Sequence, residues 1–496
     1  MEQVLNHLFT TPIVPAAFAG CAWGILGGAL PGISASITMA LLLPFTYGME
    51  PATALVMLAS TYVGAEYGGS IPAILIRTPG TNSAAATVID GYMMKQQGKA
   101  GEALGISLFS GFVGGLIGII CLVLMTEKLS SIALAFKPSS YFALGILGLS
   151  VIASLSGESL TKGLMAGVLG LMIAAIGTDP VAGMNRFTFD SPELLSGIPP
   201  ILAMVGLYAI SELFAQSGEP GWQKATKEDA RIKFPSLKMW KRLALPQFIG
   251  SIMGIFEGLT PGGGGTISAF LAYNEARRWS RHKEEFGKGS PEGVAAPETA
   301  NNTVACTALI PMLSLGIPGS NSAAILLGGF LIHNLIPGPM LFVKHGDLVN
   351  DLYTGLFVAN IAMIILGYLI MMPCIWLVNR PKPYLMAFIY ALVLSGLYSI
   401  SHSLFQIGIA LAFGVAGYAM RYFRVPFLPI VLGVVLGFMV ESNYRRALVL
   451  SSGDHNTFLE DPISLGLLGF SLVFIVGSLV RHALDLRKQD RQGLAA

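Results

Sequence analysis

The chain has 496 residues, of which 53% are hydrophobic and only 12% are charged, and its formal net charge is +2. Soluble domains carry roughly 25% charged residues, so this composition, with a mean hydropathy of +0.66, excludes an ordinary soluble enzyme and indicates an integral membrane protein. The near-neutral charge gives no reason to expect a nucleic-acid partner. The four cysteines lie far apart in apolar stretches, so they predict neither a metal site nor a disulfide framework. We expect no catalytic residues and no bound cofactor.

Long runs without Asp, Glu, Lys or Arg mark the expected transmembrane segments, because a charge is costly at the bilayer centre. Two runs, 3–49 and 299–343, each exceed the ~20 residues that one span needs. The shorter runs are 103–126, 138–157, 163–178, 194–211, 243–256, 352–379, 383–420, 425–440 and 462–480. They predict an all-α polytopic membrane protein with roughly 10–14 transmembrane helices, forming a single transporter domain over residues 1–496.

Basic residues set the predicted orientation. Three segments are rich in Lys and Arg: 216–242, 275–292 and the C-terminal tail from Arg481. By the positive-inside rule we place them in the cytoplasm. Segments poorer in these residues, which we place outside, are 179–193, 347–351 and 454–461. The C-terminus is therefore predicted to be cytoplasmic. No Lys or Arg precedes Arg77, so the start of the chain does not resemble a cleaved signal peptide, and its first apolar segment is expected to remain as a span.

The sequence contains an internal repeat. Pro79-Gly80-Thr81-Asn82-Ser83-Ala84-Ala85 recurs as Pro318-Gly319-Ser320-Asn321-Ser322-Ala323-Ala324, with an offset of 318 − 79 = 239. Upstream, Leu30-Pro31-Gly32 recurs as Thr260-Pro261-Gly262, with an offset of 261 − 31 = 230. In the same way, Glu66 precedes the first motif and Glu298 precedes the second. The segments after the two motifs fall on opposite predicted sides of the membrane, which predicts inverted repeats of the kind found in secondary transporters.

Each half is expected to hold a re-entrant hairpin and an interrupted helix. We assign residues 13–215 to the first half, 243–373 to the core of the second, and 374–496 to C-terminal transmembrane helices. The arms Tyr67–Ile76 and Thr78–Ile89 are too short to span the bilayer and fit a hairpin with Pro79-Gly80 at its apex.

A helix that begins after such a break has free backbone N–H groups, which attract carboxylates. Two opposed tips near the midplane would grip both ends of a multicarboxylate. The expected substrate-binding residues are Arg77, Gly80, Thr81, Asn82, Ser83, Gly319, Ser320, Asn321 and Ser322. Arg77 could instead snorkel to the lipid headgroups.

The interrupted helices suggest a cation site, because unwound carbonyls and hydroxyls at membrane depth can coordinate Na⁺. The expected sodium ligands are Gly32, Ser34, Ser36, Gly263 and Thr266. The alternative is that each Pro-Gly pair only marks a loop at the membrane surface. Glu66 and Glu298 either brace the hairpins or bind a cation, and we favour bracing. The glycine run 262–265 lacks the Gly-Lys-Ser/Thr of a phosphate loop, which argues against nucleotide binding.

Stretches over nearly the whole chain resemble a known family. They include 24–43, 67–105 and 292–340, and the motifs are Tyr67-Gly68-Gly69-Ser70-Ile71-Pro72-Ala73-Ile74-Leu75, Asp90-Gly91-Tyr92, Ala296-Pro297-Glu298-Thr299-Ala300-Asn301-Asn302 and Leu315-Gly316-Ile317-Pro318-Gly319. These motifs resemble the large, TctA-like membrane subunit of tripartite tricarboxylate transporters. The resemblance implies a place in the bacterial inner membrane, a small membrane subunit and a periplasmic solute-binding protein as partners, and uptake driven by a Na⁺ or H⁺ gradient. The Asn-Ser pairs at both tips, and Arg77, depart from the pattern that we expect for this family and leave the substrate open.

The function that we expect is ion-gradient-driven import of di- or tricarboxylates through the lipid bilayer. The main alternative is an uncoupled channel or facilitator for small anions, which would work without ion coupling. An intramembrane enzyme is a third class, but the sequence shows no nucleophile–base pair or metal spacing at membrane depth.

Overall fold

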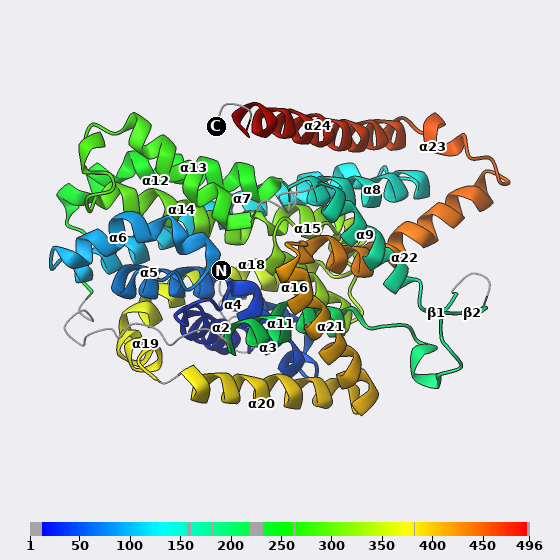
Figure 1. Ribbon diagram of the computed structural model, residues 1–496, viewed down its shortest axis with the longest axis horizontal. Helices are drawn as coiled ribbons and strands as arrows, with labels where there is room; N and C mark the ends of the chain where they lie inside the picture. Colours follow the sequence, from blue (N-terminus) through cyan, green and yellow to red (C-terminus); the bar gives the residue numbers. More distant parts are fainter. Residues whose placement is uncertain are drawn as a thin grey trace. The chain divides into compact units, whose positions relative to one another are not determined.

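The computed structural model describes residues 12–155, 160–179, 183–217, 232–260, 264–380 and 382–493, which are folded mainly as helices (Figure 1). The chain divides into two compact units, one formed by Met1–Ser131 and Tyr208–His402, the other by Ile132–Leu207 and Ser403–Ala496. These limits do not follow the predicted halves, which rest on the internal repeat and stay a prediction.

The first unit carries both copies of the repeated motif. Its helices are α2 (Ile13–Gly28), α3 (Ala35–Leu42), α4 (Pro51–Gly68), α5 (Ser70–Ile76), α6 (Thr87–Gln96), α7 (Ala100–Ala133, whose last residues enter the second unit), α11 (Ser211–Ser217), α12 (Leu237–Leu259), α13 (Gly264–Trp279), α14 (Pro291–Thr307), α15 (Leu309–Leu315), α16 (Asn321–Ile332), α17 (Pro339–Lys344), α18 (Gly346–Leu369), α19 (Met371–Val378) and α20 (Lys382–Ser401). Short 3-10 turns cover Leu43–Thr46 (η1), Asn82–Ala85 (η2) and Lys283–Glu285 (η6).

The second unit contains the remaining elements. They are α8 (Pro138–Leu155), α9 (Leu160–Ala174), β1 (Gly177–Thr178), β2 (Asn185–Arg186), η3 (Pro192–Leu194), α10 (Pro200–Met204), α21 (Leu404–Tyr422), α22 (Phe427–Leu450), α23 (Thr457–Glu460) and α24 (Pro462–Gly493). The two strands pair antiparallel. Nearby, Asp179 and Glu441 form ion pairs with Arg186 and Arg445, and these pairs tie the β1–β2 segment to α22. A π-helical turn, Val205–Ile210, follows α10.

In the described part of the chain, five helices are long and apolar enough to cross a membrane: Ala100–Ile132, Pro200–Ser217, Gly346–Leu369, Leu404–Tyr422 and Phe427–Leu450. Among the described residues, further apolar helices of 10–17 residues include Ile13–Gly28, Ala35–Thr46 and Asn321–Ile332. The prediction of an all-α polytopic membrane protein is confirmed. The estimate of 10–14 crossings stays a prediction, because many apolar helices are shorter than one span.

Helix breaks explain why the first apolar run is divided. α2 ends at Gly28, Gly32 adopts a left-handed conformation with φ 79°, and α3 begins after Ser34, whose side chain accepts a hydrogen bond from the Ile37 N–H at 3.4 Å. The second copy is divided at the equivalent place, since α12 ends at Leu259 and α13 begins at Gly264. The predicted interrupted helices are therefore present. Pro261, Gly262 and Gly263 lie outside the described residues.

Glycines let the helices of each repeat touch backbone to backbone. A Cβ at Gly20, Gly24 or Gly28 of α2 would collide with carbonyl oxygens of α4. The equivalent glycines of the second copy lie 230 positions later (250 − 20 = 230) and are Gly250, Gly254 and Gly258 of α12. A Cβ at any of them would collide with α14. Glycines at intervals of four lie on one helix face and allow close packing inside a membrane. The internal repeat is thus wider than its Pro-Gly motifs.

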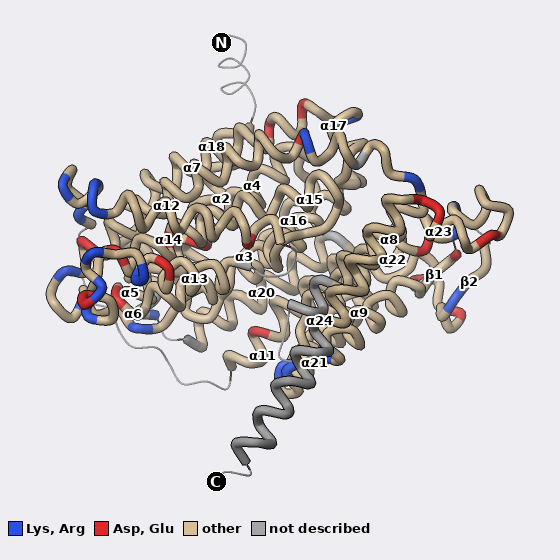
Figure 2. Tube along the Cα trace, turned by 90° about the horizontal axis from the view of Figure 1, so that it is seen from above, with Lys and Arg blue, Asp and Glu red and all other residues tan. Residues whose placement is uncertain are grey.

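The two copies contact each other reciprocally. The η2 turn of the first copy packs against α13 of the second, and α16 of the second packs against α3 of the first. Such an exchange of equivalent contacts is expected of elements related by a twofold axis. Figure 2 shows Lys, Arg, Asp and Glu gathered around α5 and α6 and at α17, whereas α2, α3 and α16 carry none.

Replacing Gly24 with Leu is expected to destabilise the protein by about 1–3 kcal/mol, because the new side chain must push α2 and α4 apart. The melting temperature of the detergent-solubilised full chain measures this change. Gly408→Leu is the matched control, because a Cβ at Gly408 meets no atom within 4 Å. Equal melting temperatures for the two variants would contradict the proposed role of the glycine face.

Candidate functional site

The first copy of the motif follows a helix that reverses at Arg77. α5 ends at Ile76, and Arg77 adopts the left-handed conformation with φ 59°. The chain then returns along α5 in an extended form. The Thr78 N–H donates to the Pro72 carbonyl at 3.4 Å, and the Gly80 N–H donates to the Gly69 carbonyl at 2.9 Å. Thr81 to Ser83 therefore lie back at the start of α5, where α4 ends.

The second copy has the same backbone path. α15 ends at Leu315, and Gly316 is left-handed with φ 76°. The Ile317 N–H donates to Pro311 at 3.3 Å, and the Gly319 N–H donates to Ala308 at 3.2 Å. Both acceptors are the first-copy acceptors shifted by the offset of the motif (311 − 72 = 239, 308 − 69 = 239). The sequence repeat is therefore also a repeat of backbone hydrogen bonds.

The expected apex at Pro79-Gly80 is wrong in detail, because the reversal occurs at Arg77. α5 spans seven residues, so its two ends are about 10 Å apart. Arg77 lies at the outer end, where its side chain is exposed and its guanidinium is 5.8 Å from the centre of the Tyr92 ring. Arg77 and Thr81 are close in the sequence but lie at opposite ends of α5, because the three residues between them run along its length. A substrate role for Arg77 stays a prediction.

Each Pro-Gly turn rests on an interrupted helix. A Cβ at Gly80 would overlap the Gly28 carbonyl oxygen at the end of α2, and a Cβ at Gly319 would lie 2.6 Å from the Gly258 oxygen at the end of α12. Any larger residue would lift the turn away from that helix end. These contacts set the position of both tips.

The residues after the turns begin the 3-10 turn η2 in the first copy and the twelve-residue helix α16 in the second. In both copies one asparagine, Asn82 or Asn321, is exposed. Its neighbours Thr81 and Ser83, and correspondingly Ser320 and Ser322, are at most 6% exposed. Ser320 caps α16 by accepting from the Ala323 N–H at 3.1 Å, and the Tyr208 hydroxyl donates to Asn321 Oδ1 at 3.2 Å. Each tip thus presents an exposed asparagine amide at the first residue of a helical segment.

Helix α4 connects the two tips. Tyr62 and Glu66 lie one turn apart on it, so their side chains share a face. The Tyr62 hydroxyl is 3.0 Å from Ser320 Oγ in the second tip. The Glu66 carboxylate accepts a hydrogen bond from Ser83 in the first tip. The structure therefore brings both tips to neighbouring positions along one helix, rather than to opposite rims of the membrane.

The residues predicted to hold sodium lie in two places. Ser36 Oγ is 3.2 Å from Ser322 Oγ, which joins α3 to the second tip, and Ser34 caps α3. Thr266 lies in the first turn of α13, at the position related to Ser36 by the offset 230. Gly32 is exposed, and Gly263 lies outside the described residues. Whether these residues bind Na⁺ stays a prediction.

The buried carboxylates do not occupy equivalent positions. The offset of 239 relates Glu66 to Ala305 and Glu298 to Ala59, so their apparent pairing in the sequence is not part of the repeat. Glu298 is fully buried and accepts hydrogen bonds from Ser70 at 2.6 Å, Ser107 at 2.9 Å and Thr87. These donors come from α5, α7 and α6, so Glu298 braces three helices around α14.

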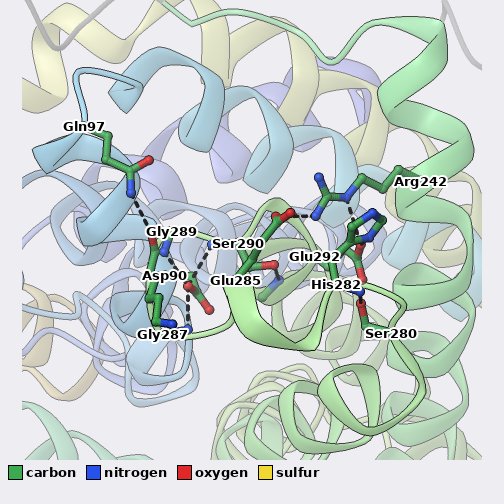
Figure 3. Close-up of polar contacts among 12 residues, drawn as sticks. Asp90, Gln97, Arg242, Ser280, His282, Glu285, Gly287, Gly289, Ser290 and Glu292 are labelled. Carbon is green, nitrogen blue, oxygen red and sulfur yellow. Dashed lines mark hydrogen bonds and ion pairs between the residues drawn. The ribbon is translucent and has the colours of Figure 1, made fainter.

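Asp90 anchors α6 to the segment between α13 and α14 (Figure 3). Its carboxylate accepts from the backbone N–H groups of Gly287, Gly289 and Ser290 at 2.8–2.9 Å, and from the Tyr273 hydroxyl at 2.9 Å. Beside it, Glu292 contacts Arg242 Nε at 2.8 Å and His282 Nδ1 at 2.9 Å. This polar cluster fixes the predicted cytoplasmic segment against the first copy.

A family model described as the tripartite tricarboxylate transporter TctA family matches residues 14–432. The chain belongs to the TctA family. This family is one of transporters and not of enzymes, so the chain is a membrane transport protein, as predicted.

Proteins of Agrobacterium vitis are similar in sequence to this chain. One, described as an uncharacterized 52.8 kDa protein in the TAR-I ttuC' 3' region, is 36% identical over 491 residues, which are 97% of each chain. Another, described as an uncharacterized protein in the TAR-II ttuC' 3' region, is 33% identical over 244 residues, which are 48% of this chain and 98% of that protein.

Sequence analysis missed several residues that shape the site of this TctA family member. Tyr62 and Asn301 occupy equivalent positions (301 − 62 = 239), and both contact the central polar network. Applying the motif offset to every polar residue would have paired them. No comparable signal pointed to Tyr208, because it reaches Asn321 from a helix 113 residues away.

Replacing Asp90 with Ala is expected to release the α13–α14 segment, because hydrogen bonds to a charged group stabilise by about 1.5–3 kcal/mol each. Trypsin should then cleave the full chain at Arg281, Lys283 or Lys288, all exposed, at least about tenfold faster. The control is Asp347→Ala, which removes an exposed acid from α18. Unchanged cleavage in the Asp90 variant would show that Asp90 does not anchor the segment.

Proposed function

We propose that the chain is the large membrane-spanning subunit of an ion-gradient-driven tripartite transporter that imports di- or tricarboxylates. The observation that carries this proposal is the pair of exposed asparagines, Asn82 and Asn321, at two duplicated helix starts that α4 connects. Helix starts favour anions, because unpaired N–H groups and the helix dipole point toward them. Two such starts suit a solute with a carboxylate at each end.

The tips supply hydrogen bonds rather than full positive charges. Their side chains are Thr81, Asn82 and Ser83 in the first copy and Ser320, Asn321 and Ser322 in the second, with backbone amides following Gly80 and Gly319. Neutral donors bind an anion reversibly, and reversible binding is needed for release on the other side. Arg77, exposed beside Tyr92 at the other end of α5, would act on the anion outside the tips.

The proposed partners follow from family membership. A periplasmic solute-binding protein would deliver the carboxylate, and a small membrane subunit would pack beside this chain in the bacterial inner membrane. Exposed apolar side chains on α12, including Phe248, Ile252 and Phe256, support contact with lipid or with another membrane helix. The cytoplasmic C-terminus is part of the same proposal.

The coupling ion would be Na⁺ or H⁺. The helix break before α3 supports this part of the proposal, because such a break leaves backbone carbonyls outside the helical hydrogen bonding. Ser34 and Ser36 stand at this break and Thr266 at the start of α13, with Gly32 and Gly263 beside them in the sequence. The second candidate, an uncoupled anion facilitator, predicts that uptake reaches only the external concentration when the ion gradients are present.

The double variant Asn82→Ala/Asn321→Ala is expected to lose carboxylate uptake at least about tenfold, because each amide contributes a hydrogen bond to a charged group. Uptake of labelled di- and tricarboxylates into proteoliposomes, with the partner subunits and binding protein present, measures this loss.

Asn350→Ala is the matched control, since Asn350 is an exposed asparagine of α18 outside both tips. Transport by the double variant at the control rate would refute the site. Accumulation above the external concentration that persists after the Na⁺ and proton gradients are collapsed would refute ion coupling.

A further inference from the structure

Glu66 is a buried carboxylate with an unusual set of neighbours. It lies on α4 with 6% of its surface exposed and accepts a hydrogen bond from Ser83 of the first tip. The Thr81 hydroxyl is 3.0 Å from Ser83 Oγ, and the Asn301 amide also lies against the Glu66 carboxyl. Within the described part of the chain, no Lys, Arg or His forms an ion pair with Glu66. A buried charge without an opposite charge is costly.

Asn301 provides a second, independent observation. It is 1% exposed, and its Nδ2 donates to the Glu66 backbone carbonyl at 3.4 Å. Its Oδ1 atom has no hydrogen-bond partner among the described residues. A Cβ placed at Gly265 would lie 2.6 Å from this oxygen and 3.1 Å from Ser83 Cβ, so Oδ1 faces the first tip. A buried, unpaired oxygen in a native structure needs a positively polarised partner.

The other well-buried carboxylates of this region differ from Glu66. Glu298 accepts three side-chain hydroxyl donors. Asp90 accepts three backbone N–H groups and a tyrosine hydroxyl. Glu66, in contrast, shares its tip with a buried amide oxygen, Asn301 Oδ1, that has no hydrogen-bond partner among the described residues.

The internal repeat places this charge at one tip alone. The positions related to Glu66 and Asn301 by the offset of 239 are Ala305 and Tyr62. The second tip therefore has a tyrosine hydroxyl beside Ser320, at 3.0 Å, and no carboxylate at the equivalent position. The two copies therefore differ in charge, because an acidic side chain stands beside the first tip and not at the equivalent position of the second.

We infer that Glu66, Asn301, Thr81 and Ser83 form a binding site for one small monovalent cation, with Na⁺ as the fitting ion. All four side chains offer hard oxygen ligands. A single carboxylate neutralises one positive charge, whereas divalent cations are held by more carboxylates or by several waters. A protonated Glu66 has a single O–H to donate, whereas a cation is ligated by several of these oxygens at once. The dependence of stability on Na⁺ and on pH distinguishes the two.

The site deepens the proposed function and rests on it for its physiological role. Glu66 is one hydrogen bond from the first tip, so its negative charge repels a carboxylate bound there. A cation on Glu66 removes this repulsion and strengthens anion binding, and by linkage the anion strengthens cation binding to the same extent. Transport of the two ions would be coupled at the first tip.

The test measures cation binding without substrate, partners or transport. The purified full chain in detergent is melted in NaCl and, at equal ionic strength, in KCl and in choline chloride. Na⁺ is expected to raise the melting temperature by several degrees at concentrations well above its Kd, because it binds the folded state only. Glu66→Gln and Asn301→Ala should each weaken the apparent Kd for Na⁺ at least about tenfold.

Tyr62→Phe is the matched control, because Tyr62 is the repeat equivalent of Asn301 and touches the second tip instead. It should keep the stabilisation by Na⁺. If Glu66→Gln does not fold, the binding of radioactive Na⁺ to Thr81→Ala and to Asn301→Ala is measured instead. Each of these variants should show the same loss of about tenfold in Na⁺ affinity. Equal stabilisation by all three salts, or a Na⁺ effect retained in both Glu66→Gln and Asn301→Ala, would overturn the site.

If the melting temperature changes with pH in the unmodified chain but not in Glu66→Gln, and does not depend on Na⁺, then Glu66 binds a proton. That result would also overturn the proposed cation site. Failure of the carboxylate site has a separate readout. If Asn82→Ala/Asn321→Ala transports normally while Na⁺ binding still requires Glu66, the proposed substrate site fails and the cation site stands.

Discussion

Direct contact between helix backbones is the constraint on which the first unit depends. Glycines at every fourth position of α2 and α12 bring these helices against carbonyl groups of α4 and α14. Inside a membrane such contacts replace the hydrophobic driving force that packs helices in water. The same closeness lets Gly80 and Gly319 rest on the ends of α2 and α12. The positions of both tips are therefore set by contacts between glycines and backbone carbonyl groups.

The polar centre depends on this frame. Because α4 packs so closely on α2, Tyr62 and Glu66 reach one tip each from adjacent turns of one helix. Reciprocal packing of η2 on α13 and of α16 on α3 closes the arrangement. The backbone therefore follows an approximate twofold symmetry, while the side chains do not. Tyr62 faces one tip and Asn301 the other, and a carboxylate stands at only one of them.

This asymmetry gives a physical basis for coupling an anion to a cation. Two neutral helix starts would bind a carboxylate by their amides alone, and a facilitator needs nothing more. A fixed negative charge beside one start makes anion binding depend on what neutralises that charge. The charged cluster of Asp90 and Glu292 has a different role, since fixed donors already satisfy it and it holds a surface segment in place.

The sequence by itself determined the class of the protein. Charge-free runs and composition predicted a helical membrane protein, and the repeated motifs predicted two equivalent helix starts, because these features are local and need no knowledge of packing. Tertiary structure decided what surrounds those starts. Arg77 is two residues from Pro79, yet an extended return of the chain separates it from Thr81, and Tyr62, Asn301 and Tyr208 join the tips from distant helices. The offset of the repeat pairs Tyr62 with Asn301, but hydrogen bonds between remote segments leave no spacing in a sequence. Which of these side chains meet Glu66 therefore became visible only when the helices were packed together.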